Sequence, residues 1–186
     1  MCVTNCTYDY IKILKWGENL IALKLTDKKS FMNQLLCSEI FDHFLLAEAS
    51  ITKDASFTID GHINASFYSK TELEEEGLSR YAVLPYAKLR PVCYQIIRGR
   101  HTPVHFKFIL MLSPENMENT LAKSGSSFAP DDIQGIFINL TFQNSQIILT
   151  TGISYSVFST DRTLEHEWDI LVQKFLKKHS ISYEEL

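Results

Sequence analysis

The chain has 186 residues, of which 45% are hydrophobic, and a formal net charge of −4 at pH 7 with His neutral. This length suits one domain with a sizeable core, and the composition is not that of a disordered chain. The acidic balance excludes a nucleic-acid binder that is basic overall, but it allows a local basic face.

No apolar run approaches the length that spans a membrane, and the N-terminus lacks the apolar region of a signal peptide. Cys37 and Cys93 are isolated, while Cys2 and Cys6 lie near the N-terminus. This is neither a disulfide framework nor a CxxC zinc site. We therefore expect a cytoplasmic protein with no membrane segment, metal or cofactor.

Residues 1–19 form a possible non-native extension. Trp16-Gly17-Glu18 must be encoded by a purine-rich tract, and Leu20 can be encoded by TTG. Together they resemble a translated ribosome-binding site followed by a non-ATG start codon. The hypothesis is that the native protein begins at Leu20. The alternative is a genuine extension in which Tyr10–Trp16 packs as an extra strand or helix.

The folded unit is expected over residues 20–186. Leu20–Leu25 predicts a strand, and Thr26 or Asp27 can cap a helix over Lys28–Leu36. Phe44–Ser69 then predicts three short strands, with Gly61 between the second and the third.

Tyr81–Leu84 is apolar and extended, and Pro85 can open a helix that runs to about Ile97. Pro91 would kink that helix, so an alternative start lies nearer Leu89. Arg98-Gly99-Arg100 closes it, with Gly99 as a C-cap.

Val104–Leu112 predicts a strand, and Ser113-Pro114-Glu115 predicts the start of a helix that Gly125 ends. Gly135–Ser159 predicts three further strands, with a polar turn at Gln143-Asn144-Ser145 and a break at Gly152. A final helix is expected over residues 163–178, with acidic residues early and lysines late.

The two predicted three-strand segments align with each other. When Phe44 is placed against Gly135, Gly61 meets Gly152 and no gap is needed. Each segment also follows a predicted strand and helix, so residues 20–69 and 81–160 predict duplicated strand–helix–three-strand units. Chance alternation is the other explanation. The fold class expected is α+β, an antiparallel sheet with helices packed on one face.

Three stretches resemble the DNA sliding-clamp domains of bacteria. They are FLLAEASITKDASFTIDGHINASF, AVLPYAKLRPVCYQIIRG and IILTTGISYSVFSTD. The resemblance covers roughly Leu20–Asp161 and implies a clamp-like fold whose helices face DNA. The chain departs from that pattern in the added strand and helix of Val104–Ser127 and in the final helix, Leu164–Lys178.

The whole chain also resembles an uncharacterised family of clostridia-type bacteria, which carries stretches similar to Phe57–His62 (FTIDGH), Arg90–Cys93 (RPVC) and Leu164–Asp169 (LEHEWD). That resemblance implies a domain of unknown function and no known activity.

A basic stretch separates the two predicted repeats. Between Arg80 and Ser113 there is no acidic residue. We expect its cations to contact nucleic-acid phosphates without reading sequence. The candidate residues are Lys88, Arg90, Arg98, Arg100 and Lys107. The alternative is a solvated helix face that balances the acidic run Glu72–Glu76.

Other chemical signals are weak. His101 and His105 are separated by a proline and a predicted strand start, which does not favour a metal site, and Cys93 fits a core thiol. No catalytic residue is predicted. The sequence indicates a non-enzymatic module that binds nucleic-acid backbone or a protein partner. The alternatives are an oligomeric scaffold or a small enzyme whose pocket collects His62, His101 and Glu165.

Overall fold

The computed structural model describes residues 21–64 and 66–186. The hypotheses about residues 1–19 and a start at Leu20 lie outside the described residues.

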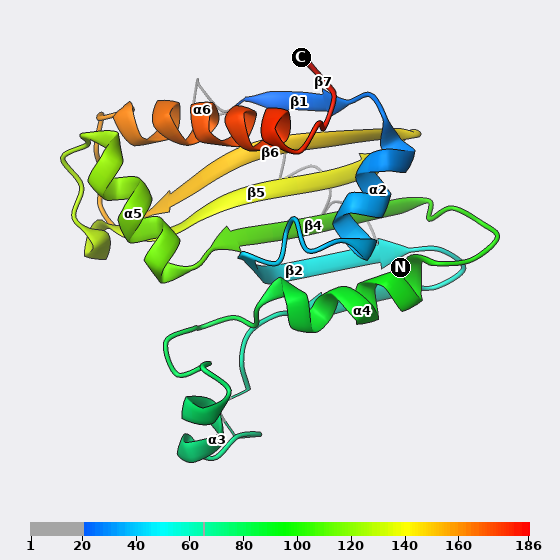
Figure 1. Ribbon diagram of the computed structural model, residues 1–186, viewed down its shortest axis with the longest axis horizontal. Coiled ribbons are helices and arrows are strands. Elements are labelled where there is room, and N and C mark those ends of the chain that lie inside the picture. Colours follow the sequence, from blue (N-terminus) through cyan, green and yellow to red (C-terminus); the bar gives the residue numbers. More distant parts are fainter. Residues whose placement is uncertain (1–20, 65) are drawn as a thin grey trace, which may run out of the picture.

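Within the described ranges the chain forms a single seven-stranded sheet and five α-helices (Figure 1). In chain order they are β1 (Ala22–Leu25), α2 (Lys28–Cys37), β2 (Phe44–Thr52), β3 (Ser56–Asp60), α3 (Lys70–Glu75), α4 (Tyr86–Ile97), β4 (His105–Leu112), α5 (Pro114–Ser124), β5 (Ile133–Gln143), β6 (Gln146–Tyr155), α6 (Thr163–Lys178) and β7 (Tyr183–Glu185).

The strand order is β3-β2-β4-β5-β6-β1-β7, and every pair is antiparallel. The predicted α+β class with an antiparallel sheet is therefore confirmed.

One face of the sheet is apolar because side chains alternate along each strand. In β4, Phe106, Phe108 and Leu110 are buried, while Lys107 and Ile109 between them point to the other face. Helices α2, α4, α5 and α6 lie over the apolar face (Figure 1) and contribute to the same core. The short helix α3 lies apart from this layer.

Several predicted helix ends are confirmed. Asp27 caps α2 by accepting a hydrogen bond from the Ser30 backbone N–H, and Ser113 caps α5 in the same way. Gly125 ends α5 with φ of 67°, a left-handed conformation that glycine adopts without strain. Helix α4 begins at Tyr86 and continues through Pro91, so the alternative start near Leu89 is wrong.

The third strand of each predicted segment is not formed. Strand β6 continues through Gly152, which pairs with Phe137, so residues 135–159 contribute one two-stranded hairpin and not three strands. Its turn residues Asn144 and Ser145 have φ of 52° and 60°, as a two-residue hairpin turn requires.

In the first segment, β2 and β3 form a hairpin, and the described residues that follow β3, 61–64, form an isolated bridge between His62 and Val83 rather than a strand. Gly61 does not mark a simple turn. A Cβ at Gly61 would lie 1.6 Å from the Leu46 backbone oxygen, beside the bulge in β2, so glycine is needed there for close backbone approach. The extended Tyr81–Leu84 segment forms no strand of its own, and the sequence reading missed β7.

A buried hydrogen bond joins the two helices that cover β2 and β4. Tyr86 of α4 is fully buried, and its hydroxyl donates to the Leu35 carbonyl of α2 at 2.9 Å. We expect Tyr86→Phe to lower the free energy of unfolding by about 1–3 kcal/mol, because a buried carbonyl loses its partner. Urea denaturation measures this change.

The matched control is Tyr94→Phe in the same helix. The Tyr94 side chain is exposed, and its loss of a hydroxyl should change stability by less than about 0.5 kcal/mol. Equal effects at the two positions would contradict a structural role for the Tyr86 bond.

Candidate nucleic-acid interface

A cavity of about 420 Å³ lies between β1, β7 and α6, and a second, of about 520 Å³, lies beside the start of α2 and the end of α4. The second, here called the basic cavity, has a floor made by neighbouring strands. Phe106 pairs with Phe142 across β4 and β5, and Phe142 pairs with Ile147 across β5 and β6. These three residues form one apolar row on the inner face of the sheet.

The walls of this cavity are formed by two segments that lie far apart in the sequence. One is the start of α2, which brings Lys28, Lys29 and Met32, and the other is the α4–β4 connection, residues 98–103. Five of the lining residues carry basic side chains, and no acidic residue is among the described ones that line it. The five are Lys28, Lys29, Arg98, Arg100 and His101.

The α4–β4 connection is fixed by the hairpin beside it. The Lys53 ammonium, from the β2–β3 turn, donates to the Ile96 and Arg98 carbonyls, both at 3.2 Å. It thus satisfies carbonyls at the end of α4, where a cation also opposes the helix dipole. Gly99 has φ of 144°, so the connection turns where a side chain would be strained. Arg98 and Arg100 therefore project from an anchored segment.

On the opposite wall, the Lys28 ammonium donates to the Ser145 carbonyl at 2.9 Å, which ties the start of α2 to the β5–β6 turn. Within the described part of the chain, Lys29, Arg98 and Arg100 form no ion pair. Their side chains are exposed, so these cations are available to an anion from solvent.

The structure separates the five basic residues expected to bind nucleic acid. Arg98 and Arg100 lie at the basic cavity. Lys88 forms an ion pair with Glu76. Lys107 lies on β4 between the buried Phe106 and Phe108, so it faces away from the helices.

Arg90 pairs with Asp42 at 2.9 Å, and both side chains are about four-fifths buried. Sequence reasoning missed Lys28 and Lys29, and it considered His101 as half of a histidine pair and as part of a dispersed enzyme pocket, but not as a phosphate contact. The adjacent lysines were visible, but no local pattern shows that the start of α2 packs beside residues 98–101.

The remaining candidates do not converge. His101 lines the basic cavity, which His62 and Glu165 do not line. His62 bonds Asp60 at 2.6 Å in an exposed turn, and hydrogen bonds from His62 lower the pKa of Asp60. Glu165 accepts from Arg162 at 2.7 Å and from the Tyr155 hydroxyl at 3.4 Å.

Among the described residues, no group of three His, Cys, Asp or Glu side chains is placed to hold a metal ion. Cys93 is fully buried, as expected of a core thiol, and burial raises its pKa to about 12. No helix in the described ranges is long and apolar enough to cross a membrane.

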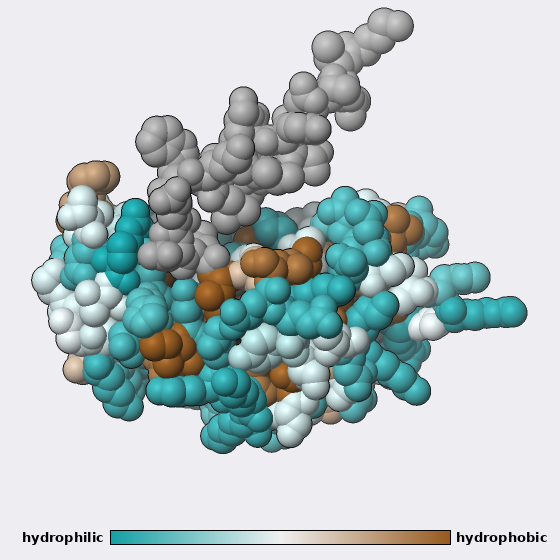
Figure 2. Space-filling view, turned by 90° about the horizontal axis from the view of Figure 1, so that it is seen from above, coloured by the Kyte–Doolittle hydropathy of each residue, from teal (hydrophilic) through white to brown (hydrophobic). Residues whose placement is uncertain are grey.

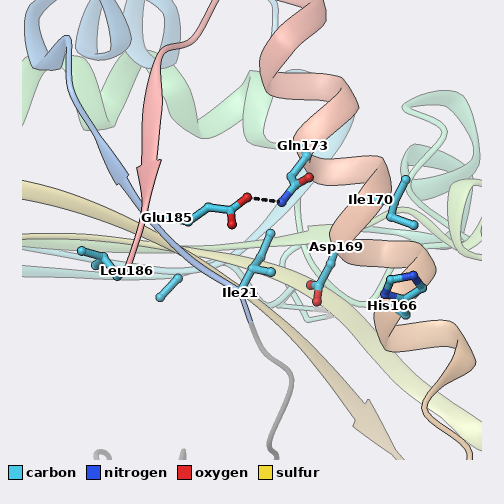
Figure 3. Close-up of a pocket in the computed structure, with 8 residues that line it drawn as sticks. Ile21, His166, Asp169, Ile170, Gln173, Glu185 and Leu186 are labelled. Atoms are coloured by element: carbon cyan, nitrogen blue, oxygen red, sulfur yellow. Dashed lines mark hydrogen bonds between the residues drawn. The ribbon is translucent and has the colours of Figure 1, made fainter.

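Figure 3 shows the cavity of about 420 Å³, which is lined by α6, by Ile21 and the start of β1, and by Glu185 and Leu186 at the C-terminal end of the chain. Asp169 of α6 is buried there and accepts a hydrogen bond from the Thr151 hydroxyl at 2.5 Å. Gln173 donates to Glu185 across the cavity at 3.0 Å. Figure 2 shows the molecule from above the view of Figure 1. On this face the coloured surface is mostly hydrophilic, with small hydrophobic patches between the polar side chains.

Burial is the main cause of a raised pKa at Asp169, and the charge of Glu165 adds to it, while the Thr151 hydrogen bond opposes it. Since the folded-state pKa lies above the unfolded value, this group favours folding most at low pH. That contribution is lost as the pH rises through the folded-state pKa.

We therefore expect Asp169→Asn, which keeps an acceptor for Thr151, to gain stability relative to the unchanged protein as the pH rises from about 4 to about 7. Chemical denaturation of both proteins across that range measures the difference. A difference that stays constant with pH would show that Asp169 does not titrate in this way.

The ion pair of Arg90 predicts a structural role. Removing Arg90 leaves the Asp42 carboxylate mostly buried with one partner fewer. We expect Arg90→Ala to cost about 1.5–3 kcal/mol of unfolding free energy, whereas Lys88→Ala, which breaks a more exposed pair, should cost less than about 1 kcal/mol. Urea denaturation measures the unfolding free energy of the two variants. Equal losses of unfolding free energy would show that the buried Arg90–Asp42 pair stabilises the fold no more than the exposed Lys88–Glu76 pair.

Comparison with curated proteins and with solved structures gives no match. The model of a family of unknown function, DUF5721, matches residues 34–184. That range contains β2 to β6, the last four residues of α2, and the α4–β4 connection with its two arginines. By this match over most of its length, the chain belongs to the DUF5721 family of unknown function.

Proposed function

We propose that this protein is a non-enzymatic binding module that holds the phosphate backbone of nucleic acid at the basic cavity. The observation that carries the proposal is the convergence of cations from α2 and from the α4–β4 connection on one cavity whose described lining has no carboxylate. Lysine and arginine in such an arrangement bind phosphates and release counterions, without reading base sequence.

Arg98 and Arg100 have the main part in this proposal because they are exposed and form no ion pair within the described chain. Lys88 and Arg90 have a lesser part, since each already contacts a carboxylate. Lys107 lies on the opposite face of the sheet and would contact a different part of a long strand. A cytoplasmic location belongs to the same proposal.

We also propose that the two β-hairpins descend from one duplicated, clamp-like unit. Two features support this idea. The β2–β3 and β5–β6 hairpins are both antiparallel, and Ala49 and Leu140, which align in sequence, are both fully buried on the inner face. Binding at the basic cavity does not require a closed ring, so the function can be tested separately from this ancestry.

The test is fluorescence anisotropy of a labelled oligonucleotide over a range of salt concentrations. We expect binding at low salt that weakens as salt rises, and a lower affinity for Arg98→Ala/Arg100→Ala. Losing two phosphate contacts should make the dependence of log K on log salt shallower by about 1.4 for a single strand and about 1.8 for a duplex.

The matched control is Lys177→Ala/Lys178→Ala, which removes the same charge from the exposed end of α6. It should leave both affinity and salt slope nearly unchanged. An equal loss in the control would mean that only overall charge matters, and no binding at low salt by the unchanged protein would overturn the proposal.

A further inference from the structure

We infer that the ligand of the basic cavity is single-stranded nucleic acid, with one unpaired base seated on the apolar floor and the neighbouring phosphates held at the mouth. This inference rests on the proposed function and names the form of nucleic acid that the site accepts.

The first support is the volume and the apolar lining of the cavity. A site that binds only phosphates needs an exposed basic surface, yet here the basic side chains surround a volume of about 520 Å³. That volume lies within the range of about 300–1,000 Å³ for ligand pockets, which are mostly apolar with a few polar groups. Its apolar lining consists of Met32, Leu36, Ile97, Pro103, Phe106, Phe142 and Ile147.

The aromatic rings of the floor supply the second support. The rings of Phe106 and Phe142 are stacked, with centroids 5.2 Å apart and an angle of 16° between their planes. Phe106 is almost fully buried, whereas Phe142 is half-buried and lines the cavity. A base that enters can therefore meet the Phe142 ring, and base–aromatic stacking is a general means of holding single strands.

The arrangement of charge is the third support. Lys28 and Lys29 stand on the α2 side of the cavity, and Arg98 and Arg100 stand on the side of the α4–β4 connection. A ligand with one anionic group would use one side only. A backbone that crosses the mouth presents phosphates to both sides while the base between them points inward, which is how basic grooves and stacking platforms combine in single-strand binding.

A duplex does not fit these three features together. Its bases are paired and stacked inside, so placing one in the cavity would first require it to be flipped out at a cost in free energy. In a single strand the bases are already free to leave the stack and pack on aromatic side chains. An acidic peptide with an apolar anchor is the competing ligand, and the experiment includes it.

The experiment measures affinities by fluorescence anisotropy at low salt for three nucleic acids of equal length and, separately, for an acidic peptide with a central phenylalanine. The nucleic acids are a labelled oligothymidine, the same strand with its bases replaced by abasic sites, and a random-sequence DNA duplex. We expect the oligothymidine to bind more tightly than the abasic strand or the duplex. Phe142→Leu, which keeps an apolar side chain but removes the aromatic ring, should weaken oligothymidine binding by about fivefold or more. Its affinity for the abasic strand and for the duplex should not change.

The control variant is Phe128→Leu, which removes a partly buried ring that packs on Tyr155 with centroids 4.8 Å apart, outside the cavity lining. It should bind every ligand as the unchanged protein does. Because Phe142→Leu could disturb packing, Met32→Trp serves as a second variant that fills the cavity without removing the floor. It should reduce binding of oligothymidine and leave binding of the abasic strand intact. Circular dichroism confirms that each variant is folded.

The outcomes separate this inference from the function on which it rests. If oligothymidine, abasic strand and duplex bind equally and all depend on Arg98 and Arg100, phosphate binding stands and the seated base is wrong. If no nucleic acid binds at low salt, both are wrong. If an acidic peptide with a central phenylalanine binds in a Phe142-dependent way and oligothymidine does not, the cavity belongs to a protein partner and the inference is overturned.

Discussion

The structure depends on covering one apolar face of an antiparallel sheet. Because side chains alternate along a strand, the buried residues of β4, β5 and β6 form continuous rows across the sheet, and these rows must be removed from water. The four helices α2, α4, α5 and α6 provide the cover. This cover is incomplete over the row formed by Phe106, Phe142 and Ile147. There the start of α2 and the α4–β4 connection lie on either side of the row. The basic cavity is the space left where the helical layer ends.

The polar groups inside this core show why it has one arrangement. Three buried side chains of the helical layer make specific hydrogen bonds: Tyr86 donates to the Leu35 carbonyl, Asp169 accepts from Thr151, and the Trp168 indole donates to the Phe137 carbonyl at 3.0 Å. A shift of α4 or α6 would break these bonds and leave buried groups unpaired, at a cost of about 1–3 kcal/mol each. The apolar layer drives packing, and these bonds fix where each helix lies upon it.

The elements that sequence predicted well are those with a local physical cause. Alternation in residues 136–142 and the caps at Ser113 and Gly125 depend only on neighbouring residues, and the structure confirms them. Gly61 and Gly152 were both predicted to interrupt a strand, and this was wrong because glycine also occurs where the backbone is closely approached or where a strand simply continues. At Gly61 the cause is a backbone oxygen from β2, which lies too close for any side chain. At Gly152 the strand β6 continues without a break, and a Cβ would meet only the Asn139 side chain at 3.6 Å. The local sequence does not distinguish these two cases.

The same reasoning explains why only part of the candidate site could be predicted. Arg98 and Arg100 stood out because the stretch around them has no acidic residue, but charge along a chain does not show which carboxylates will meet it. Glu76, which directly follows α3, pairs with Lys88, and Asp42 of the α2–β2 connection pairs with Arg90. These pairs reduce the local field on one part of α4.

Positive charge is instead concentrated where α4 ends, and the start of α2 adds two lysines there. A protein of net charge −4 can present a positive site because its carboxylates pair with cations elsewhere and the folded chain brings the remaining cations together. The Lys53 ammonium adds to the positive potential at this site. It donates hydrogen bonds to the carbonyls at the end of α4, which would otherwise place negative potential beside Arg98. The fold thus produces the electrostatic character of the cavity from residues that are dispersed along the sequence.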